Sequence, residues 1–226
     1  MARSAQSPLA RGYLIAYNAA SVGAWGWILF RLIANMLANG GDYRSNYAAF
    51  GWELTLIQTT MVLDVVHVAL GLVRSSVLTT AIQIMSRIII VWIQCQLFNA
   101  PMVVESAAFT TMILAWSVTE VVRYSYYAAN LLGANLSLLT WARYTFFFIL
   151  YPVGAGSEAT LIYKSLPAAH AVDPKLYWFF CSLIFLYLPL FPKMYMHMIR
   201  LRRKVLSPAK ATVKAGSTPL KKKKKL

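Results

Sequence analysis

Ionisable side chains interrupt several long apolar stretches of the sequence, where a charge is costly and usually faces the interior of a helix bundle. Each of them is therefore a candidate either for function or for pairing between helices. The candidates are Arg31, Glu53, Asp64, His67, Arg87, Glu120, Arg123 and Arg143. Because the arginines outnumber the carboxylates in this set, another group, such as part of a substrate, must balance some of the positive charge.

Helical spacing places three pairs of polar residues on common helix faces. The pairs are Gln83 with Arg87, Glu120 with Arg123, and Asp64 with His67. Counting inward from the expected cytosolic ends of their helices places four residues at depths of roughly 12 to 17 Å, where they could share one layer. These residues are Asp64, Arg87, Glu120 and Arg143. Two interpretations stay open. One is structural ion pairs, favoured for Glu120 with Arg123, and the other is a role facing the substrate, favoured for Arg87 and Arg143.

The stretch YPVGAGSE, residues 151–158, ends an apolar run with a phenol, helix-breaking residues and a carboxylate. Pro152 removes a helix hydrogen bond, and Gly154 and Gly156 favour unwinding, so we expect the helix to end or unwind here. An unwound turn would bring Glu158 back toward Tyr151, and non-helical backbone at membrane depth is tolerated where it lines a cavity. The alternative is an interfacial tyrosine followed by a loop glutamate.

The segment HVALGLVRSS, residues 67–76, has the outline of a tyrosine-phosphatase loop that begins at His67 and reaches Arg74. Phosphatase chemistry needs a thiolate at the position that Val68 occupies. The segment also ends an apolar run instead of following a soluble strand. Phosphatase activity is therefore excluded.

The composition is that of an integral membrane protein. Of 226 residues, 59% are hydrophobic and only seven are acidic, which is far from an ordinary soluble domain. The net charge of +15 owes much to the C-terminal tail, because eleven of the 22 basic residues follow residue 199. No basic face with interleaved aromatic residues points to nucleic acid. Cys95 and Cys181 lie in apolar runs, so neither a disulfide framework nor a metal site is implied.

Six windows are long enough to cross a bilayer as helices. They cover approximately residues 13–37, 49–73, 77–98, 107–128, 132–153 and 176–199, and the longest connection between them runs from 154 to 175. The expected fold is an all-α, six-helix transmembrane bundle in one domain, residues 1–200. The N-terminal segment is expected to be a retained first span, because it lacks a compact signal-peptide pattern.

Basic residues near the ends of the spans predict that both termini face the cytosol. That side would collect Arg3, Arg11, Arg74, Arg123 and the tail, against Arg44, Lys164 and Lys175 on the other side. The tail, residues 201–226, is expected to be disordered. It is interpreted either as a polybasic segment near anionic headgroups or, through Lys223 and Lys224, as a dilysine retrieval signal of the endoplasmic reticulum.

These residues together resemble the very-long-chain (3R)-3-hydroxyacyl-CoA dehydratase family, also called protein-tyrosine-phosphatase-like membrane proteins. The likeness rests on AWSVTEVVRYSYYA (115–128) and RYTFFFILYPVGAGSE (143–158), supported by LDVVHVALGLVRSS and QIMSR. It implies an enzyme of the endoplasmic reticulum membrane that converts a (3R)-3-hydroxyacyl-CoA into the trans-2-enoyl-CoA, the third step of fatty-acid elongation. It also implies association with the condensing enzyme and the two reductases of that cycle, and it calls for no metal or cofactor.

The resemblance also implies roles for single residues. The family's catalytic tyrosine and glutamate fall on Tyr151 and Glu158. The remaining motif positions fall on Gln83, Arg87, Glu120, Arg123, Arg143 and Gly154. Two places depart from the family pattern: Asp64 stands where glutamate is common, which leaves its role as ligand or brace open, and Val68 and Arg74 lie in a loop that commonly carries cysteine and proline.

Dehydration next to a thioester needs a base for the alpha proton, an acid for the leaving hydroxyl and donors for the enolate oxygen. We expect the Glu158 carboxylate to remove the proton and neutral Tyr151 to protonate the hydroxyl, with the reversed assignment open. Backbone N–H groups near Gly154 and Gly156 would face the thioester oxygen if the helix unwinds. The alternatives are a non-enzymatic membrane adaptor of the elongation enzymes and a small lipid or ion carrier.

Overall fold

Serine caps and glycine turns delimit the helices of a computed structural model that describes residues 7–206. The side chains of Ser7, Ser76 and Ser106 each accept a hydrogen bond from a first-turn N–H, and Gly133 ends a helix with a left-handed φ of 81°, as expected of capping residues. The elements are α1 Pro8–Ala38, η1 Tyr43–Ser45, α2 Asn46–Thr60, α3 Val62–Ala69, α4 Val77–Ile88, η2 Ile89–Leu97 (a π-helix), α5 Pro101–Val104, α6 Ala107–Leu132, α7 Ser137–Thr145, α8 Phe147–Val172 and α9 Pro174–Leu206. No strand occurs among these residues.

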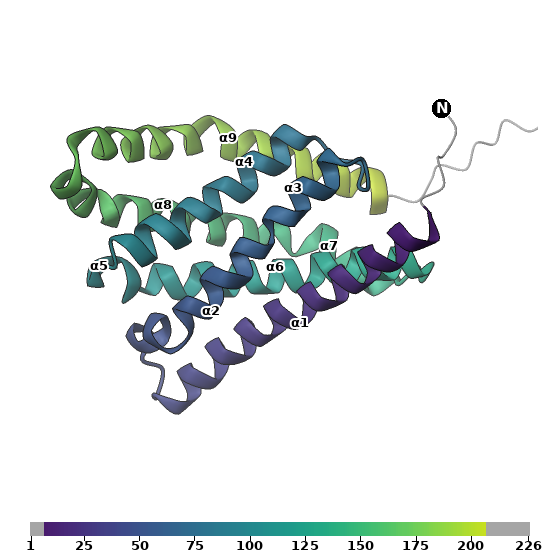
Figure 1. Cartoon of the computed structure of the whole chain (residues 1–226), viewed down its shortest axis with the longest axis horizontal. Coiled ribbons are helices and arrows are strands. Elements are labelled where there is room, and N and C mark those ends of the chain that lie inside the picture. The colour runs from purple at the N-terminus through teal and green to yellow at the C-terminus, as the bar shows by residue number, and fades with distance from the viewer. Residues whose placement is uncertain (1–6, 207–226) are drawn as a thin grey trace, which may run out of the picture.

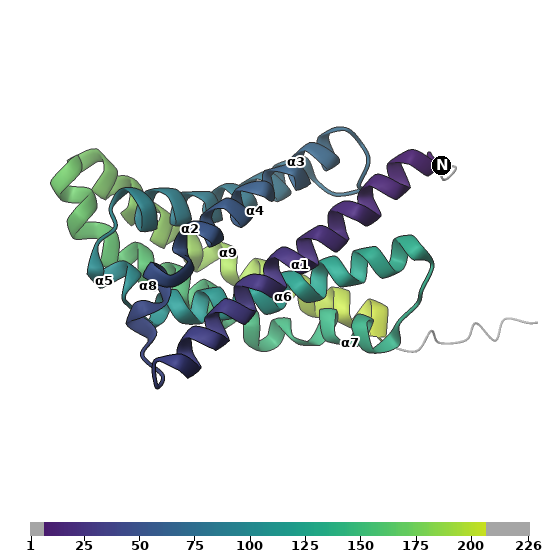
Figure 2. The same ribbon diagram turned by 60° about the horizontal axis from the view of Figure 1, so that its bottom comes forward.

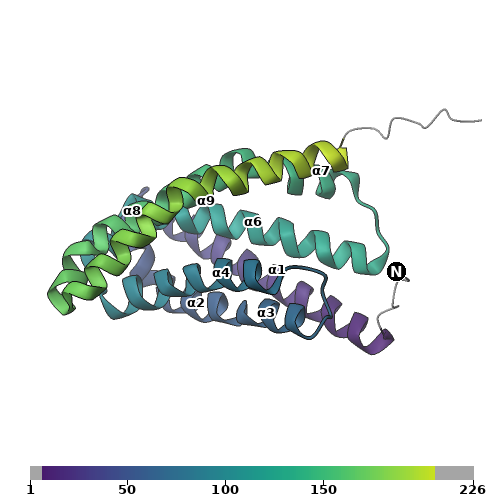
Figure 3. The ribbon, with the colours of Figure 1, turned by 90° about the horizontal axis from the view of Figure 1, so that it is seen from above.

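The long helices run back and forth along one axis (Figure 1). α1 is followed in alternating directions by α2 with α3, α4 with η2, α6, α7 with α8, and α9. α6 packs between α1 and α8, and α9 covers the other side of α8 (Figure 3). The start of α1 and the end of α9 lie at the same end of the bundle, as do α7 and the turn after α6 (Figure 2).

The core follows α1, α2 and α6, whereas the outer helices show apolar side chains to the surroundings. Trp25, Phe50, Phe109 and Trp116 are almost completely buried. In contrast, α9 buries only Phe180. Such an apolar exterior is what a lipid environment requires of a helix bundle.

Fewer helices qualify as membrane spans than the six windows predict. In residues 7–206, three helices are long and apolar enough to cross a membrane, namely α1, the continuous α4 with η2, and α9, and the bent pair α7 and α8 could make a fourth. α2 and α3 are each too short to span a membrane, because the helix is interrupted between them at Met61. α6 has the length, but Glu120 and Arg123 lower its mean hydropathy.

The expected unwinding after Tyr151 is wrong. α8 continues without interruption from Phe147 to Val172 through Pro152, Gly154 and Pro167, and the chain bends by 41° just before it, between α7 and α8. In apolar surroundings each freed backbone group is costly. A proline removes one helix hydrogen bond, whereas unwinding the whole stretch would free several.

The continuity of α8 changes two further expectations. The connection expected over residues 154–175 is mostly helix, and backbone N–H groups of an intact helix are not free to face a thioester oxygen at Gly154 or Gly156.

The C-terminal helix is longer than expected. α9 runs to Leu206, six residues into the segment expected to be a disordered tail. Lys223 and Lys224 lie outside the described residues.

Candidate active site

Glu158 on α8 accepts hydrogen bonds from two neutral side chains on two neighbouring helices. The indole Nε1 of Trp116 on α6 donates to Oε1 over 2.8 Å, and the hydroxyl of Tyr187 on α9 donates to Oε2 over 2.7 Å. Glu158 makes no ion pair with any residue in the described part of the chain. It is therefore a half-buried carboxylate that is oriented but not neutralised by a cation.

Tyr151 lies on the same face of α8, seven residues before Glu158, about 10 Å away along the helix axis. Its half-buried ring stacks on Phe191 and Tyr195 of α9, with centroid separations of 5.0 and 6.2 Å. Within residues 7–206 no hydrogen bond joins Tyr151 to Glu158. The two side chains thus share one seam between α8 and α9, placed there by helical periodicity and not by an unwound turn.

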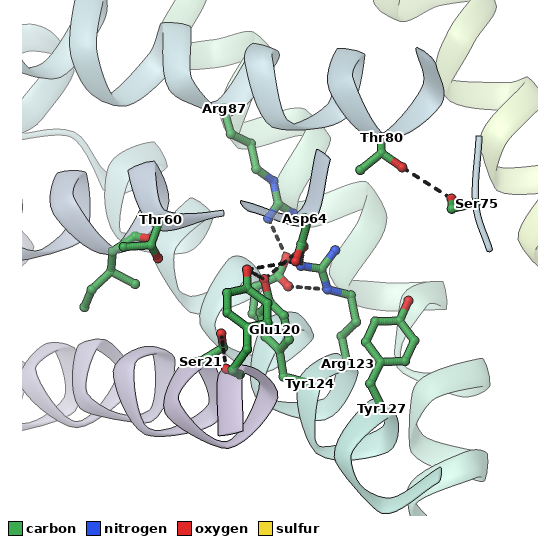
Figure 4. A network of polar contacts seen from close by, with 12 residues as sticks. Ser21, Thr60, Asp64, Ser75, Thr80, Arg87, Glu120, Arg123, Tyr124 and Tyr127 are labelled. Carbon is green, nitrogen blue, oxygen red and sulfur yellow. Dashed lines mark hydrogen bonds and ion pairs between the residues drawn. The ribbon is translucent and has the colours of Figure 1, made fainter. Parts of the chain in front are cut away.

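A charged cluster lies beside this seam and joins α3, α4 and α6 (Figure 4). Arg87 pairs with Glu120 over 2.5 Å. Arg123 forms an ion pair with Glu120 over 2.6 Å and donates a hydrogen bond to Asp64 over 2.8 Å. The side chain of Glu120 is only 2% exposed, so this carboxylate depends on its two guanidinium partners. With two carboxylates and two arginines the cluster is balanced in charge.

Two tyrosines complete the coordination of Asp64. The hydroxyl of Tyr17 donates to Oδ1 over 2.8 Å and that of Tyr124 donates to Oδ2 over 3.0 Å. With Arg123, these contacts tie α1, α3 and α6 together. Asp64 therefore has the contacts of a structural brace.

Trp116 connects the charged cluster to Glu158. The Arg87 guanidinium lies 4.7 Å from the centroid of the Trp116 ring, a cation–π geometry. The Nε1–H of the same indole donates to Glu158. Gly154 of α8 faces this tryptophan, since a Cβ at Gly154 would lie 3.7 Å from Ala115 Cβ and 4.0 Å from the Trp116 ring. These are ordinary van der Waals distances, so Gly154 lies at the contact between α8 and α6 without being required by it.

The structure confirms some of the predicted pairings and contradicts others. Glu120 does pair with Arg123 one turn away. Arg87, however, bonds Glu120 and not the exposed Gln83. His67 contacts the Tyr13 hydroxyl over 2.9 Å, so it does not pair with Asp64. Spacing along one helix predicts a shared face but cannot weigh a stronger partner on another helix.

The predicted polar layer contains Asp64, Arg87 and Glu120 but not Arg143. Arg143 on α7 donates to the Tyr127 hydroxyl over 2.9 Å, one turn of α6 beyond Arg123. The helix that carries Arg143 begins only at Ser137, so a depth counted inward from residue 132 places Arg143 too far into the bundle. A separate pair, Arg31 with Glu53, lies elsewhere on α1 and α2 and is about one-third exposed.

Sequence reasoning missed the two residues that hold Glu158. Trp116 lies inside the quoted stretch 115–128, four residues before Glu120, so helical periodicity pointed to it. Tyr187 lies 29 residues after Glu158, and nothing local marks it. No group of three His, Cys, Asp or Glu side chains suited to a metal ion occurs in residues 7–206.

The fold and the site define an all-helical membrane protein with ionisable side chains between its helices. The pattern of the family described as protein tyrosine phosphatase-like protein, PTPLA, matches residues 58–208. The chain belongs to this family. The comparison with solved structures found no match.

Curated relatives cover most of the chain. It is 42% identical over 205 residues to the probable very-long-chain (3R)-3-hydroxyacyl-CoA dehydratase of Schizosaccharomyces pombe, covering 88% of this chain and 95% of the relative. It is 37% identical over 213 residues to the human very-long-chain (3R)-3-hydroxyacyl-CoA dehydratase 2, covering 88% and 83%. For the mouse very-long-chain (3R)-3-hydroxyacyl-CoA dehydratase 1, identity is 36% over 211 residues, with 88% and 74% covered.

Proposed function

We propose that the protein removes water from a very-long-chain (3R)-3-hydroxyacyl-CoA to give the trans-2-enoyl-CoA, as the third step of fatty-acid elongation. The observation that carries this proposal is the arrangement of Glu158, an oriented carboxylate without a cationic partner, on the same seam as Tyr151. The names of the relatives support the substrate class. Phosphatase chemistry is not supported, because Val68 offers no nucleophile.

In the proposed reaction Glu158 acts as the base and Tyr151 as the acid. The Glu158 carboxylate takes the proton from the alpha carbon, and the electrons of that C–H bond form the new carbon–carbon double bond. As the bond from the beta carbon to oxygen breaks, the phenol of Tyr151 protonates the leaving hydroxyl, which departs as water. The cycle closes when the proton on Glu158 returns to the Tyr151 phenolate. The axial separation of about 10 Å leaves room for the reacting carbons between the two side chains.

Tyr187 and Trp116 would act on this step by holding Glu158. Two neutral donors orient a carboxylate without neutralising it, which leaves it able to accept a proton. The charged cluster would hold Trp116 in place through the contact of the Arg87 guanidinium with the indole ring. The cluster consists of Asp64, Arg87, Glu120 and Arg123. Gln83 and Arg143 are proposed to serve substrate binding or support, away from the reacting carbons.

We further propose six membrane passes, with both termini in the cytosol, in the endoplasmic reticulum membrane. The alternating helix directions support an even number of passes, and both ends of the described chain lie at one end of the bundle. Residues 1–200 would form the catalytic domain and residues 201–226 a cytosolic tail. The condensing enzyme and the reductases of elongation are the proposed partners, in line with the fatty-acid chemistry in the relatives' names.

Turnover by the purified protein tests the function. In lipid nanodiscs, a long-chain (3R)-3-hydroxyacyl-CoA should be converted to the trans-2-enoyl-CoA, detected as a loss of 18 Da by mass spectrometry, the mass of one water. The (3S) isomer is the control and should not react. If the folded protein is inert toward the (3R) substrate in lipid, the adaptor alternative replaces the enzyme.

The hydrogen bond from Tyr187 to Glu158 should matter for turnover and little for binding. In Tyr187→Phe we expect kcat to fall about tenfold or more with KM within about twofold, since a hydrogen bond to a charged group contributes about 1.5–3 kcal/mol. The control is Tyr163→Phe, because Tyr163 lies on α8 with 68% of its surface exposed. Equal rates for Tyr187→Phe and the control would show that Glu158 is held in another way during the reaction.

A further inference from the structure

Positive charge gathers at the end of the bundle where the described chain starts and stops, and no acidic side chain balances it there. Of the seven acidic residues of the sequence, three lie in the turns at the opposite end: Asp42, Glu105 and Asp173. The other four lie within helices, each with a partner of its own. The end of the bundle where the described chain starts and stops therefore attracts anions.

Arg143 is a basic residue of this end whose guanidinium is held by neighbouring side chains. Its Nη2 donates to the Tyr127 hydroxyl over 2.9 Å. Its guanidinium lies 5.0 Å from the ring centroid of Tyr126, 4.7 Å from that of Tyr127 and 5.8 Å from that of Tyr144. These aromatic rings hold the guanidinium in place without neutralising its charge.

The hydrogen-bonding capacity of Arg143 is only partly used. Within residues 7–206 it forms no ion pair, and its Nε is buried without a hydrogen-bond partner. A guanidinium carries five N–H donors in a fork suited to phosphate. A preoriented, unpaired guanidinium is thus a natural contact for an anionic oxygen.

A second arginine with the same character comes from the neighbouring helix. Arg202, near the C-terminal end of α9, lies 5.5 Å from the ring centroid of Phe148 at the start of α8. Its Nε is also buried without a hydrogen-bond partner among the described residues. Since α7 packs against α9, the two arginines belong to helices that are in contact at this end of the bundle.

We propose that Arg143, together with Arg202, binds the phosphate groups of the coenzyme A moiety, outside the seam that holds Glu158. This inference rests on the proposed function and assigns the polar part of its substrate to the α7–α9 junction. The acyl thioester then extends from this junction toward Tyr151 and Glu158. Phosphates of anionic lipid headgroups share the same chemistry, and the experiment separates the two sources.

The test compares two thioesters of the same (3R)-3-hydroxy acid, one with coenzyme A and one with N-acetylcysteamine, which has no phosphate. In nanodiscs of phosphatidylcholine, Arg143→Gln should raise KM for the coenzyme A thioester about tenfold or more, because charge-assisted hydrogen bonds are lost. Its kcat, and its KM for the phosphate-free thioester, should stay within about twofold of the wild type. Arg202→Gln should act in the same direction.

The matched control is Arg44→Gln, because Arg44 is exposed and lies at the opposite end of the bundle. Equal losses for both thioesters would overturn the proposal and make Arg143 a structural residue. A normal KM for both thioesters would also overturn the proposal. An effect that appears only when anionic lipid is added would overturn it too, because it would assign the bound phosphate to a lipid headgroup. If Arg143→Gln does not fold, Arg143→Lys and Arg202→Gln provide the same comparison.

Binding of free coenzyme A keeps this inference separate from the proposed function. Coenzyme A should raise the thermal midpoint of the wild type and of Glu158→Gln, but not that of Arg143→Gln, because a ligand stabilises the state that it binds. A wild type that binds coenzyme A yet turns over neither thioester would refute only the dehydratase. A wild type that turns over both thioesters with the same KM would refute only the phosphate site.

Discussion

Glu158→Gln should lower kcat for dehydration by about 10²- to 10⁴-fold, the contribution typical of a positioned acid or base. The amide cannot accept the alpha proton. Its single oxygen also satisfies only one of the two donors, Trp116 and Tyr187, that Glu158 bonds at 2.8 and 2.7 Å. The resulting loss of stability, about 1–3 kcal/mol, is checked by thermal unfolding so that kcat is compared between folded proteins.

Tyr151→Phe is the matching change at the acid and should lower kcat by a similar factor. The phenylalanine ring keeps the stack on Phe191, whose centroid lies 5.0 Å away, so packing is preserved while the proton donor is removed. Glu105→Gln is the control, because Glu105 is exposed in the turn after α5.

The two variants together discriminate between assignments of the pair. A large loss in Tyr151→Phe with activity retained in Glu158→Gln would refute the version in which Glu158 is the base. Full activity in both variants would move the site away from the seam between α8 and α9. The measurement is the initial rate of enoyl-CoA formation at saturating substrate.

Removing Glu120 should have the largest effect on stability of any single change in the charged cluster. Its carboxylate, with a side chain only 2% exposed, holds Arg87 and Arg123. Glu120→Met would leave excess positive charge inside the bundle, so we expect a loss of about 3–5 kcal/mol in the free energy of unfolding. The measurement is reversible unfolding in mixed micelles.

A double variant separates the lost charge balance from the lost packing. Removing both partners of a buried ion pair costs less than removing one, so Glu120→Met with Arg87→Met should recover part of the stability. Glu53→Met is the control. Its pair with Arg31 is about one-third exposed, and we expect a change of less than about 1 kcal/mol. Equal losses for Glu53→Met and Glu120→Met would show that the cluster is not a special brace.

The sequence by itself determined the class of the protein and the contacts made within one helical turn. Long apolar runs with few acidic residues define a helical membrane protein, because backbone groups in lipid must bond within the helix. The pairing of Glu120 with Arg123 was predictable for a similar reason, since a three-residue spacing places both on one helix face. The same periodicity accounts for Tyr151 and Glu158 on one face of α8.

Only the tertiary structure decided which of these residues meet. Glu120 bonds Arg87, which is 33 residues away in the sequence. Glu158 bonds Trp116 and Tyr187, which are 42 and 29 residues away. No local pattern sets such distances, because they depend on how α4, α6, α8 and α9 cross. Local propensity also failed at Pro152 and Gly154, where α8 stays helical between α6 and α9. Unwinding there would free backbone groups that apolar surroundings cannot satisfy, so packing overrides the preference of individual residues.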